Sequence, residues 1–445
     1  MKRFQWKIIT ILIIGLFFGF PVILLQSEIE STTRINIIGC TENIEDFQMN
    51  TKKSTFDCTS TSLSPIMEKR PLLFILIEFA DKSHSPEHDY EYFENILWGD
   101  RNSLSDYYHE VSYGTFTYTK AGILGWYKST YRYKWLPFNL LLIPSQAFKA
   151  ASQDHSFNFA QYDKNGDQII SYDELSVTIV ISASYPRPMV AMAPPWGKKI
   201  ETWDHVYLSG QFNIVQEWQV LDTFAHELGH TLGAVDLYDY FFFPPFTTGA
   251  SFGTGNYGLM SDTGIGPRPE NPPHFCAWSK IKIGWIDPIV VTQDGYYEIP
   301  DIARNPTAYI LCNQSHSPEE YFLIANRQPG IHYDLDLPDT GIIIYHIDES
   351  GDNDDETHKL VDIECADSPS SHFKNADDLD KFLLRGNKGD SHDLWDKYGY
   401  VFHDNSEPCN ARWYDGSKSG VVVGVQSESG KTMKVWLSIN GNLPL

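Results

Sequence analysis

Two histidines four residues apart, with a glutamate directly after the first, constrain this chain more than any other feature of its sequence. They form His226-Glu227-Leu228-Gly229-His230, within a segment from 216 to 232 whose apolar residues recur at helical spacing. Positions i and i+4 of a helix lie about 40° apart on one face, so both imidazoles can reach one metal ion. Glu227 is then directed beside that ion, where a general base acts. The pattern predicts a zinc-dependent hydrolase; the alternative is a helix with two surface histidines.

The residues after this motif predict how a third ligand reaches the metal. Gly233 can adopt the left-handed conformation that ends a helix, and Asp236 follows three residues later. A short carboxylate that returns to the histidines gives three protein ligands and leaves a fourth position for water, as catalytic zinc requires. Asp239 is the rival third ligand, and either carboxylate can instead stabilise a turn.

Several stretches of the sequence resemble one protease family. His226–Asp239, HELGHTLGAVDLYD, is similar to the HExxHxxGxxD motif of the immune inhibitor A family of secreted zinc metalloproteases, relatives of the metzincins. The stretch 256–261, NYGLMS, resembles the Met-turn of that family, which implies that Met260 packs beneath the metal. The similarity extends from about residue 70 to near the C-terminus and includes the stretches 106–114, 277–285, 321–328 and 341–348.

The resemblance implies a fold and an activity. It implies a metzincin-like protease domain at 70–288, in which a mixed sheet carries the active-site helix. Short β-rich runs separated by Gly, Asp, Asn and Pro predict a β-rich C-terminal domain at 289–445, so the overall class is α+β. The implied activity is that of an endopeptidase acting on protein or peptide substrates, with a metal-activated water and Glu227 as base. Tyr257 is a candidate donor to the oxyanion. Val235 stands where the family often has Pro, so the choice of third ligand stays open.

A second motif predicts a structural calcium ion. Oxygen ligands fall at positions 1, 3, 5, 9 and 12 of a twelve-residue loop, with a backbone carbonyl at position 7. The residues are Asp163, Asn165, Asp167, Ser171 and Glu174, with the carbonyl of Ile169. Gln168 stands where such loops usually have Gly, so it must take a positive φ at some cost, or the turn differs. An acidic surface turn is the alternative, and the acidic run 348–356 is either a further calcium site or a solvated loop.

The N-terminus predicts an extracellular protein. Three basic residues precede an apolar run at 8–25, which favours an uncleaved signal anchor over a cleaved signal peptide at 1–27. Both place the rest of the chain outside the cell, where 28–69 would form a stalk or a short pro-segment. Six cysteines permit three disulfides in an oxidising compartment, and Cys40 with Cys58 is a local pair. The net charge of −24 argues against a nucleic-acid partner.

Local patterns predict individual elements of the protease domain. The near-continuous apolar runs at 72–79 and 176–181 are typical of strands buried on both faces. The alternation at 115–126 suggests a hairpin. Helical spacing recurs at 89–98, 103–109 and 145–152.

A binding protein is the competing hypothesis for function. In that case the chain would be a calcium-stabilised surface adhesin on a protease-like fold. Metal analysis separates the two hypotheses, because only the enzyme needs about one zinc ion per chain.

Overall fold

The computed structural model describes an α+β protein, which confirms the class predicted from the sequence. The described ranges are 69–135, 142–183, 199–208, 212–238, 251–261, 271–313, 315–353, 355, 358–367 and 388–444. The signal or anchor segment, the stalk before residue 69, Cys40, Cys58 and Asp239 lie outside these ranges. Within them, no helix combines the length and the apolar character that crossing a membrane requires.

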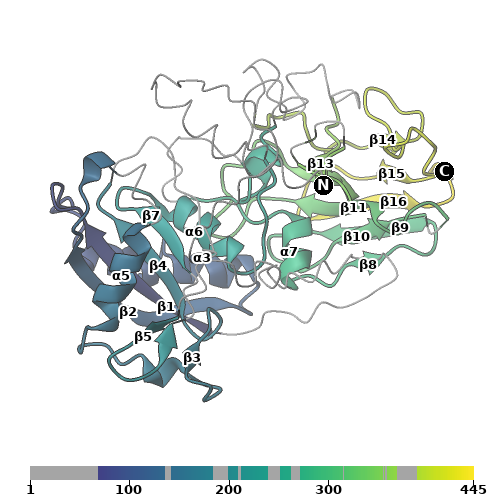
Figure 1. Cartoon of the computed structure of the whole chain (residues 1–445). Helices are drawn as coiled ribbons and strands as arrows, with labels where there is room; N and C mark the ends of the chain where they lie inside the picture. The colour runs from purple at the N-terminus through teal and green to yellow at the C-terminus, as the bar shows by residue number, and fades with distance from the viewer. Residues whose placement is uncertain are drawn as a thin grey trace, which may run out of the picture. The chain divides into compact units, whose positions relative to one another are not determined.

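A four-stranded parallel sheet organises the first part of the structure (Figure 1). Its strands, in spatial order, are β2 (Thr117–Lys128), β1 (Lys69–Glu78), β4 (Ser176–Ile181) and β7 (Asn213–Gln216). Side chains of β1 alternate between two cores: even-numbered residues 72–76 enter one core and odd-numbered residues 73–77 enter the other. The predicted burial of β1 on both faces is therefore confirmed, and every residue of β4 is buried as well.

Helices cover both faces of this sheet, because parallel strands must be joined by crossover connections. The helices α2 (Tyr90–Trp98), α3 (Leu104–Val111) and α6 (Leu221–His230) share one core with β1. The helix α5 (Ile143–Ser152) contributes to the other core. The three helical stretches predicted before residue 153 are thus confirmed. The helices α3 and α6 are in contact, and the Tyr108 hydroxyl of α3 donates to the carbonyl of Ala225 in α6 at 2.6 Å.

Three sequence predictions are wrong in this part. The segment 115–126 is no hairpin: β2 is one long strand parallel to β1, and α5 then carries the chain across to β4. The four described strands are all parallel, where a mixed sheet was expected. The helix predicted from Gln216 begins at Leu221, because the β-branched residues Ile214 and Val215 continue a buried strand up to Gln216.

Smaller elements complete this part. A three-stranded sheet has the order β3 (Ile169–Ile170), β6 (Tyr207–Leu208) and β5 (Ile200–Glu201). The helix α7 (Ala277–Ile283) ends at Gly284, whose φ of 86° is left-handed. Single 3-10 turns are η1 (Tyr133–Trp135), η3 (Ala160–Tyr162) and η4 (Gly255–Tyr257).

The part after residue 288 is β-rich, as predicted, and its described strands form two sheets. One has the order β13 (Val361–Ile363), β12 (Gly341–Asp348), β11 (Glu320–Arg327), β10 (Tyr309–Leu311) and β8 (Ile289–Val290). The other has the order β14 (Val401–His403), β15 (Val422–Val425), β16 (Thr432–Ser438) and β9 (Gly295–Pro300). Apolar side chains of both sheets meet in one core, so the sheets pack against each other.

The hydrophobic core does not end at residue 288. In β11, Phe322 and Ile324 enter the core between the two sheets, whereas Tyr321 and Leu323 enter the core that α6 and α7 share. The central strands of the β-rich part are therefore buried on both faces. The cysteines in the described ranges are all buried, and no disulfide links any of them to another: Cys276, Cys312, Cys365 and Cys409.

Candidate metal centre

Three side chains singled out by the sequence converge at the end of α6. His226 and His230 lie one turn apart on this helix, and Asp236 lies on the loop that follows. One ligand atom of each lies within 4.8 Å of the other two. Asp236 Oδ1 is 2.9 Å from His226 Nε2 and 3.5 Å from His230 Nε2. The structure thus brings the three candidate ligands together.

The turn after α6 explains why Asp236 can reach the two histidines. Gly233 has a φ of 91°, the left-handed conformation that the sequence predicts. Its N–H donates to the carbonyl of His230 at 3.0 Å, and the N–H of Ala234 donates to the carbonyl of Gly229 at 3.2 Å. These two bonds form a Schellman motif, which stops the helix and reverses the chain.

Backbone carbonyls fix the orientation of both imidazole rings. His226 Nδ1 is 2.9 Å from the carbonyl oxygen of Leu259, and His230 Nδ1 is 3.0 Å from that of Ala234. Because a carbonyl oxygen only accepts, each Nδ1 donates its proton, and each neutral ring keeps its lone pair on Nε2. His230 Nε2 is buried and has no hydrogen-bond partner among the described residues. A buried acceptor without a hydrogen bond lowers the stability of the folded protein unless a ligand binds it.

The geometry and the charges of the three residues suit a metal ion. Ligand atoms at about 2.0–2.1 Å from a tetrahedral ion stand about 3.3 Å apart, a value between the two distances to Asp236 Oδ1, 2.9 and 3.5 Å. Burial by itself would lower the pKa of His226, but the hydrogen bond with Asp236 and the charge of Glu227 raise it to about 9. Glu227 is 3% exposed on the same helix. The surroundings of His226 therefore favour a positive charge, whereas burial and then the charge of His226 lower the pKa of His230.

Met260 packs against α6 directly below the motif. A Cβ atom added to Gly229 would lie 3.0 Å from Met260 Sδ and 2.9 Å from Phe275 Cε1. The carbonyl of Met260 accepts the N–H of Leu237 at 2.8 Å, next to Asp236. Glycine at 229 is thus required by the close approach of the methionine and the ring. The stretch that resembles a Met-turn contacts the helix and the loop after it.

The hydroxyl of Tyr257 is bound to a carboxylate. Its side chain is fully buried, and its hydroxyl donates to Asp393 Oδ2 at 2.9 Å. Burial, followed by the charge of Asp393, raises the pKa of Tyr257. In the structure this hydroxyl is bound to a buried carboxylate, and its role as a donor to the oxyanion stays a prediction.

The predicted calcium loop is closed by its own side chains. Gln168 has a φ of 66°, the positive value that its position requires. Asp163 accepts the N–H of Gly166 at 2.9 Å and that of Gln168 at 3.0 Å. The carboxylate of Glu174 accepts two bonds: Oε1 accepts the N–H of Lys164 at 2.9 Å, and Oε2 accepts the N–H of Ser171 at 2.9 Å. The twelfth residue of the loop is therefore directed back toward the first, as a calcium loop requires.

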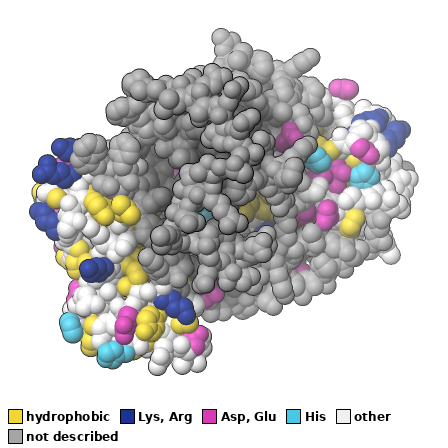
Figure 2. Space-filling view, viewed as in Figure 1, with side chains coloured by type: hydrophobic (Ala, Val, Ile, Leu, Met, Phe, Trp, Pro, Cys, Tyr) yellow, Lys and Arg dark blue, Asp and Glu magenta, His cyan; other side chains and the backbone are white. Residues whose placement is uncertain are grey.

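One further group of potential ligands occurs in the described residues. One ligand atom each of Asp367, Asp390 and His392 lies within 4.8 Å of the others, and Asp367 and His392 are exposed. Figure 2 shows Asp, Glu and His side chains close together on the visible face near the C-terminal strands. Exposed acidic groups commonly gather without an ion. Among the described residues, the triad at the end of α6 is therefore taken as the candidate centre.

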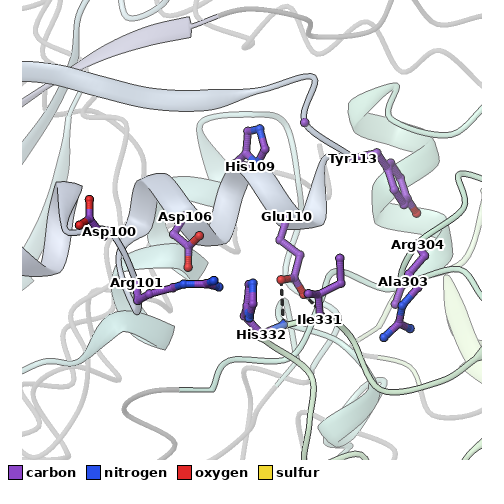
Figure 3. A pocket seen from close by; sticks show the side chains of 11 residues that line it. Asp100, Arg101, Asp106, His109, Glu110, Tyr113, Ala303, Arg304, Ile331 and His332 are labelled. Carbon is purple, nitrogen blue, oxygen red and sulfur yellow. Dashed lines mark hydrogen bonds between the residues drawn. The ribbon is translucent and has the colours of Figure 1, made fainter.

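A pocket of about 520 Å³ lies beside α3, and its described lining contains none of the three candidate ligands. Figure 3 shows Glu110 at its wall, where the carboxylate accepts the N–H groups of Ile331 and His332, each at 2.9 Å. Arg304, on the same wall, donates to the carbonyls of Pro329 and Gly330, each at 2.9 Å. Both charged groups thus hold the loop before β12 in place.

Sequence reasoning missed a group of buried charges beneath the Met-turn stretch. Arg327 and Asp334 are buried and pair at 2.8 Å. Lys280 is fully buried, with its Nζ 3.1 Å from the Tyr113 hydroxyl and 3.4 Å from His274 Nδ1. Burial, followed by the charge of Arg327, lowers the pKa of Lys280 to about 7. The available signal was a charged residue at the end of an apolar strand, as at Arg327.

Comparisons with known proteins add no family to these observations. No protein-family model matches the chain, and no curated protein matches it. The function therefore has to be inferred from the chemistry of the site and from the resemblance of its motifs.

Proposed function

We propose that this chain is an extracellular zinc-dependent endopeptidase of the immune inhibitor A type, with a metzincin-like protease domain. The observation that carries the proposal is the convergence of His226, His230 and Asp236 within 4.8 Å. Two imidazole nitrogens and one carboxylate oxygen are a donor set typical of catalytic zinc. Carbonyl groups already hold the far nitrogen of each ring, which is the usual arrangement around histidine ligands.

His226, His230 and Asp236 would hold the ion, and zinc, when bound, would lower the pKa of a water molecule and polarise the scissile carbonyl. Glu227 follows His226 on the same helix and is buried, so its carboxylate can act where bulk water does not compete. It takes a proton from the attacking water and delivers it to the leaving amine. The loop after Gly233 supplies Asp236, and three protein ligands would leave a fourth position for water.

Two further assignments belong to this proposal. The loop from Asp163 to Glu174 would bind a structural calcium ion, supported by its closed conformation and by the positive φ of Gln168. The apolar segment 8–25 would direct the chain outside the cell and, if uncleaved, anchor it in the membrane. Substrates would be proteins or peptides.

The test is zinc content together with chelator-sensitive proteolysis of the purified full chain. We expect about one zinc ion per chain, cleavage of casein, and loss of cleavage with 1,10-phenanthroline. Glu227→Gln should keep the zinc and the fold but cleave casein at least about 10²-fold more slowly, because it lacks a base. Near-normal proteolysis by this variant would refute the assigned base. A folded chain that holds no zinc would instead favour the calcium-stabilised binding protein.

A further inference from the structure

Two side chains from the β-rich part contact the backbone of the candidate metal centre. Asn353 lies between β12 and β13, is 8% exposed, and donates from Nδ2 to the carbonyl oxygen of Asp236 at 3.2 Å. Its Oδ1 accepts the N–H of Val361 at 3.3 Å. One amide therefore joins the backbone of the third candidate ligand to the start of β13.

The second contact reaches the other side of the centre. Arg327, the last residue of β11, donates from Nη2 to the carbonyl oxygen of Tyr257 at 3.1 Å. Asp334 pairs with the same guanidinium at 2.8 Å and holds it in place. Two residues after Tyr257, the carbonyl of Leu259 accepts the bond from His226 Nδ1. Arg327 is thus linked to the first candidate ligand through three residues of backbone.

We propose that side chains of the β-rich part position the ligands of the metal centre: Asn353 positions Asp236, and Arg327 positions His226. The inference rests on the proposed zinc site. A carboxylate ligand binds well only if its backbone is held where the side chain can reach the ion. The loop 234–238 has no helix or strand of its own, so contacts from outside must hold it. The groups around metal ligands typically contribute 10- to 100-fold in metal affinity.

Asn353→Asp is the most informative variant, because it replaces the donor Nδ2 with an acceptor oxygen and keeps the shape of the side chain. The carboxylate can still accept from Val361, but it cannot donate to Asp236 and repels that carbonyl. Asn326→Asp is the matched control. Asn326 is fully buried on β11 and donates to the carbonyls of Ile299 and Gly430, at 3.0 and 2.9 Å, away from the centre.

The measurement is the dissociation constant for zinc, obtained by competition with a chromophoric chelator, together with thermal unfolding of the zinc-free chains. We expect Asn353→Asp to weaken zinc binding 10- to 100-fold, while Asn326→Asp lowers the unfolding temperature but binds zinc as the wild type does. At saturating zinc, Asn353→Asp should regain most of its proteolytic rate, because Glu227 is intact. A purely structural role for Asn353 would leave the dissociation constant unchanged.

Arg327→Lys tests the second contact. Lysine keeps the charge that pairs with Asp334, but a single ammonium cannot reproduce the planar fork that also reaches Tyr257. We expect weaker zinc binding and a changed visible absorption spectrum of the cobalt-substituted protein, because the carbonyl that orients His226 shifts. An unchanged spectrum and affinity would remove Arg327 from the inference.

The outcomes separate the two proposals. If the wild type binds zinc and Asn353→Asp binds it within about twofold, the positioning role is wrong and the protease proposal stands. The same holds if Asn326→Asp weakens binding as much as Asn353→Asp does. A wild-type chain that binds no zinc overturns both.

Discussion

Adding one methyl group at Gly229 tests whether α6, the helix with both candidate histidine ligands, depends on close packing against the stretch 256–261. A Cβ there would lie 2.9 Å from Phe275 Cε1 and 3.0 Å from Met260 Sδ. Relaxed contacts between such atoms are about 3.5–4.0 Å long. Overpacking costs about 1–3 kcal/mol, whereas alanine in place of a helical glycine contributes about 1 kcal/mol. We therefore expect Gly229→Ala to lower the free energy of unfolding by up to about 2 kcal/mol.

A double-mutant cycle with Met260→Ala isolates the packing contribution. Met260→Ala alone removes buried atoms and should cost about 2–5 kcal/mol. In the double variant, the new methyl group occupies part of the space that the methionine leaves. The combined loss should therefore be smaller than the sum of the single losses by about 1 kcal/mol or more. Denaturant titration at constant calcium with a zinc chelator gives these free energies without a contribution from zinc binding.

Gly430→Ala is the control for the general effect of replacing a glycine. A Cβ on Gly430 meets no atom within 4 Å, and its φ is not left-handed. The control should change the free energy of unfolding by less than about 1 kcal/mol. The double variant loses a certain free energy of unfolding. If this loss equals the sum of the two single losses within about 0.5 kcal/mol, Met260 and Gly229 do not share one tightly packed contact.

Two further predictions follow from single residues. Gln168→Gly should raise the affinity for calcium severalfold, because a glycine adopts the φ of 66° without strain, and a calcium titration that shows weaker binding would contradict this. Lys280 has a pKa of about 7 in the folded chain, against about 10.5 when unfolded. Between these values the unfolded chain binds more protons, so the lysine makes stability rise with pH from about 7 upward. Lys280→Met should lack this contribution, so the free energy of unfolding of the wild type minus that of the variant should rise from pH 7 to 9.5. A difference that stays constant over this range would contradict the prediction.

The part of the candidate metal centre that lies on α6 could be predicted from the sequence, and the reason is geometric. The i, i+4 spacing of His226 and His230 fixes their common face once the segment is helical, and Gly233 marks the helix end. Asp236 could be predicted as a candidate ligand ahead of its rival Asp239, but the position of its loop could not, because loop conformation depends on contacts from elsewhere. Those contacts come from distant residues, such as Met260.

The fold shows the same division between local and distant information. Apolar runs predicted β1 and β4 correctly, because burial on both faces leaves a pattern in the strand itself. The alternation in β2 suggests a hairpin, but period two is shared by antiparallel strands and by a parallel edge strand. β2 pairs with β1 across the connection that contains α2 and α3, and this connection lies outside the pattern of β2 itself.

The shared core bears on the choice between an enzyme and a binding protein. An attached binding module would bury its apolar side chains in a core of its own, behind a linker with few contacts. Here β11 places Tyr321 and Leu323 in the core that also contains Phe224 and Leu228 of α6. Losing the β-rich part would therefore remove part of the core to which the helix with both histidines belongs. That shared core favours one structural unit over a protease-like scaffold with a separate binding domain.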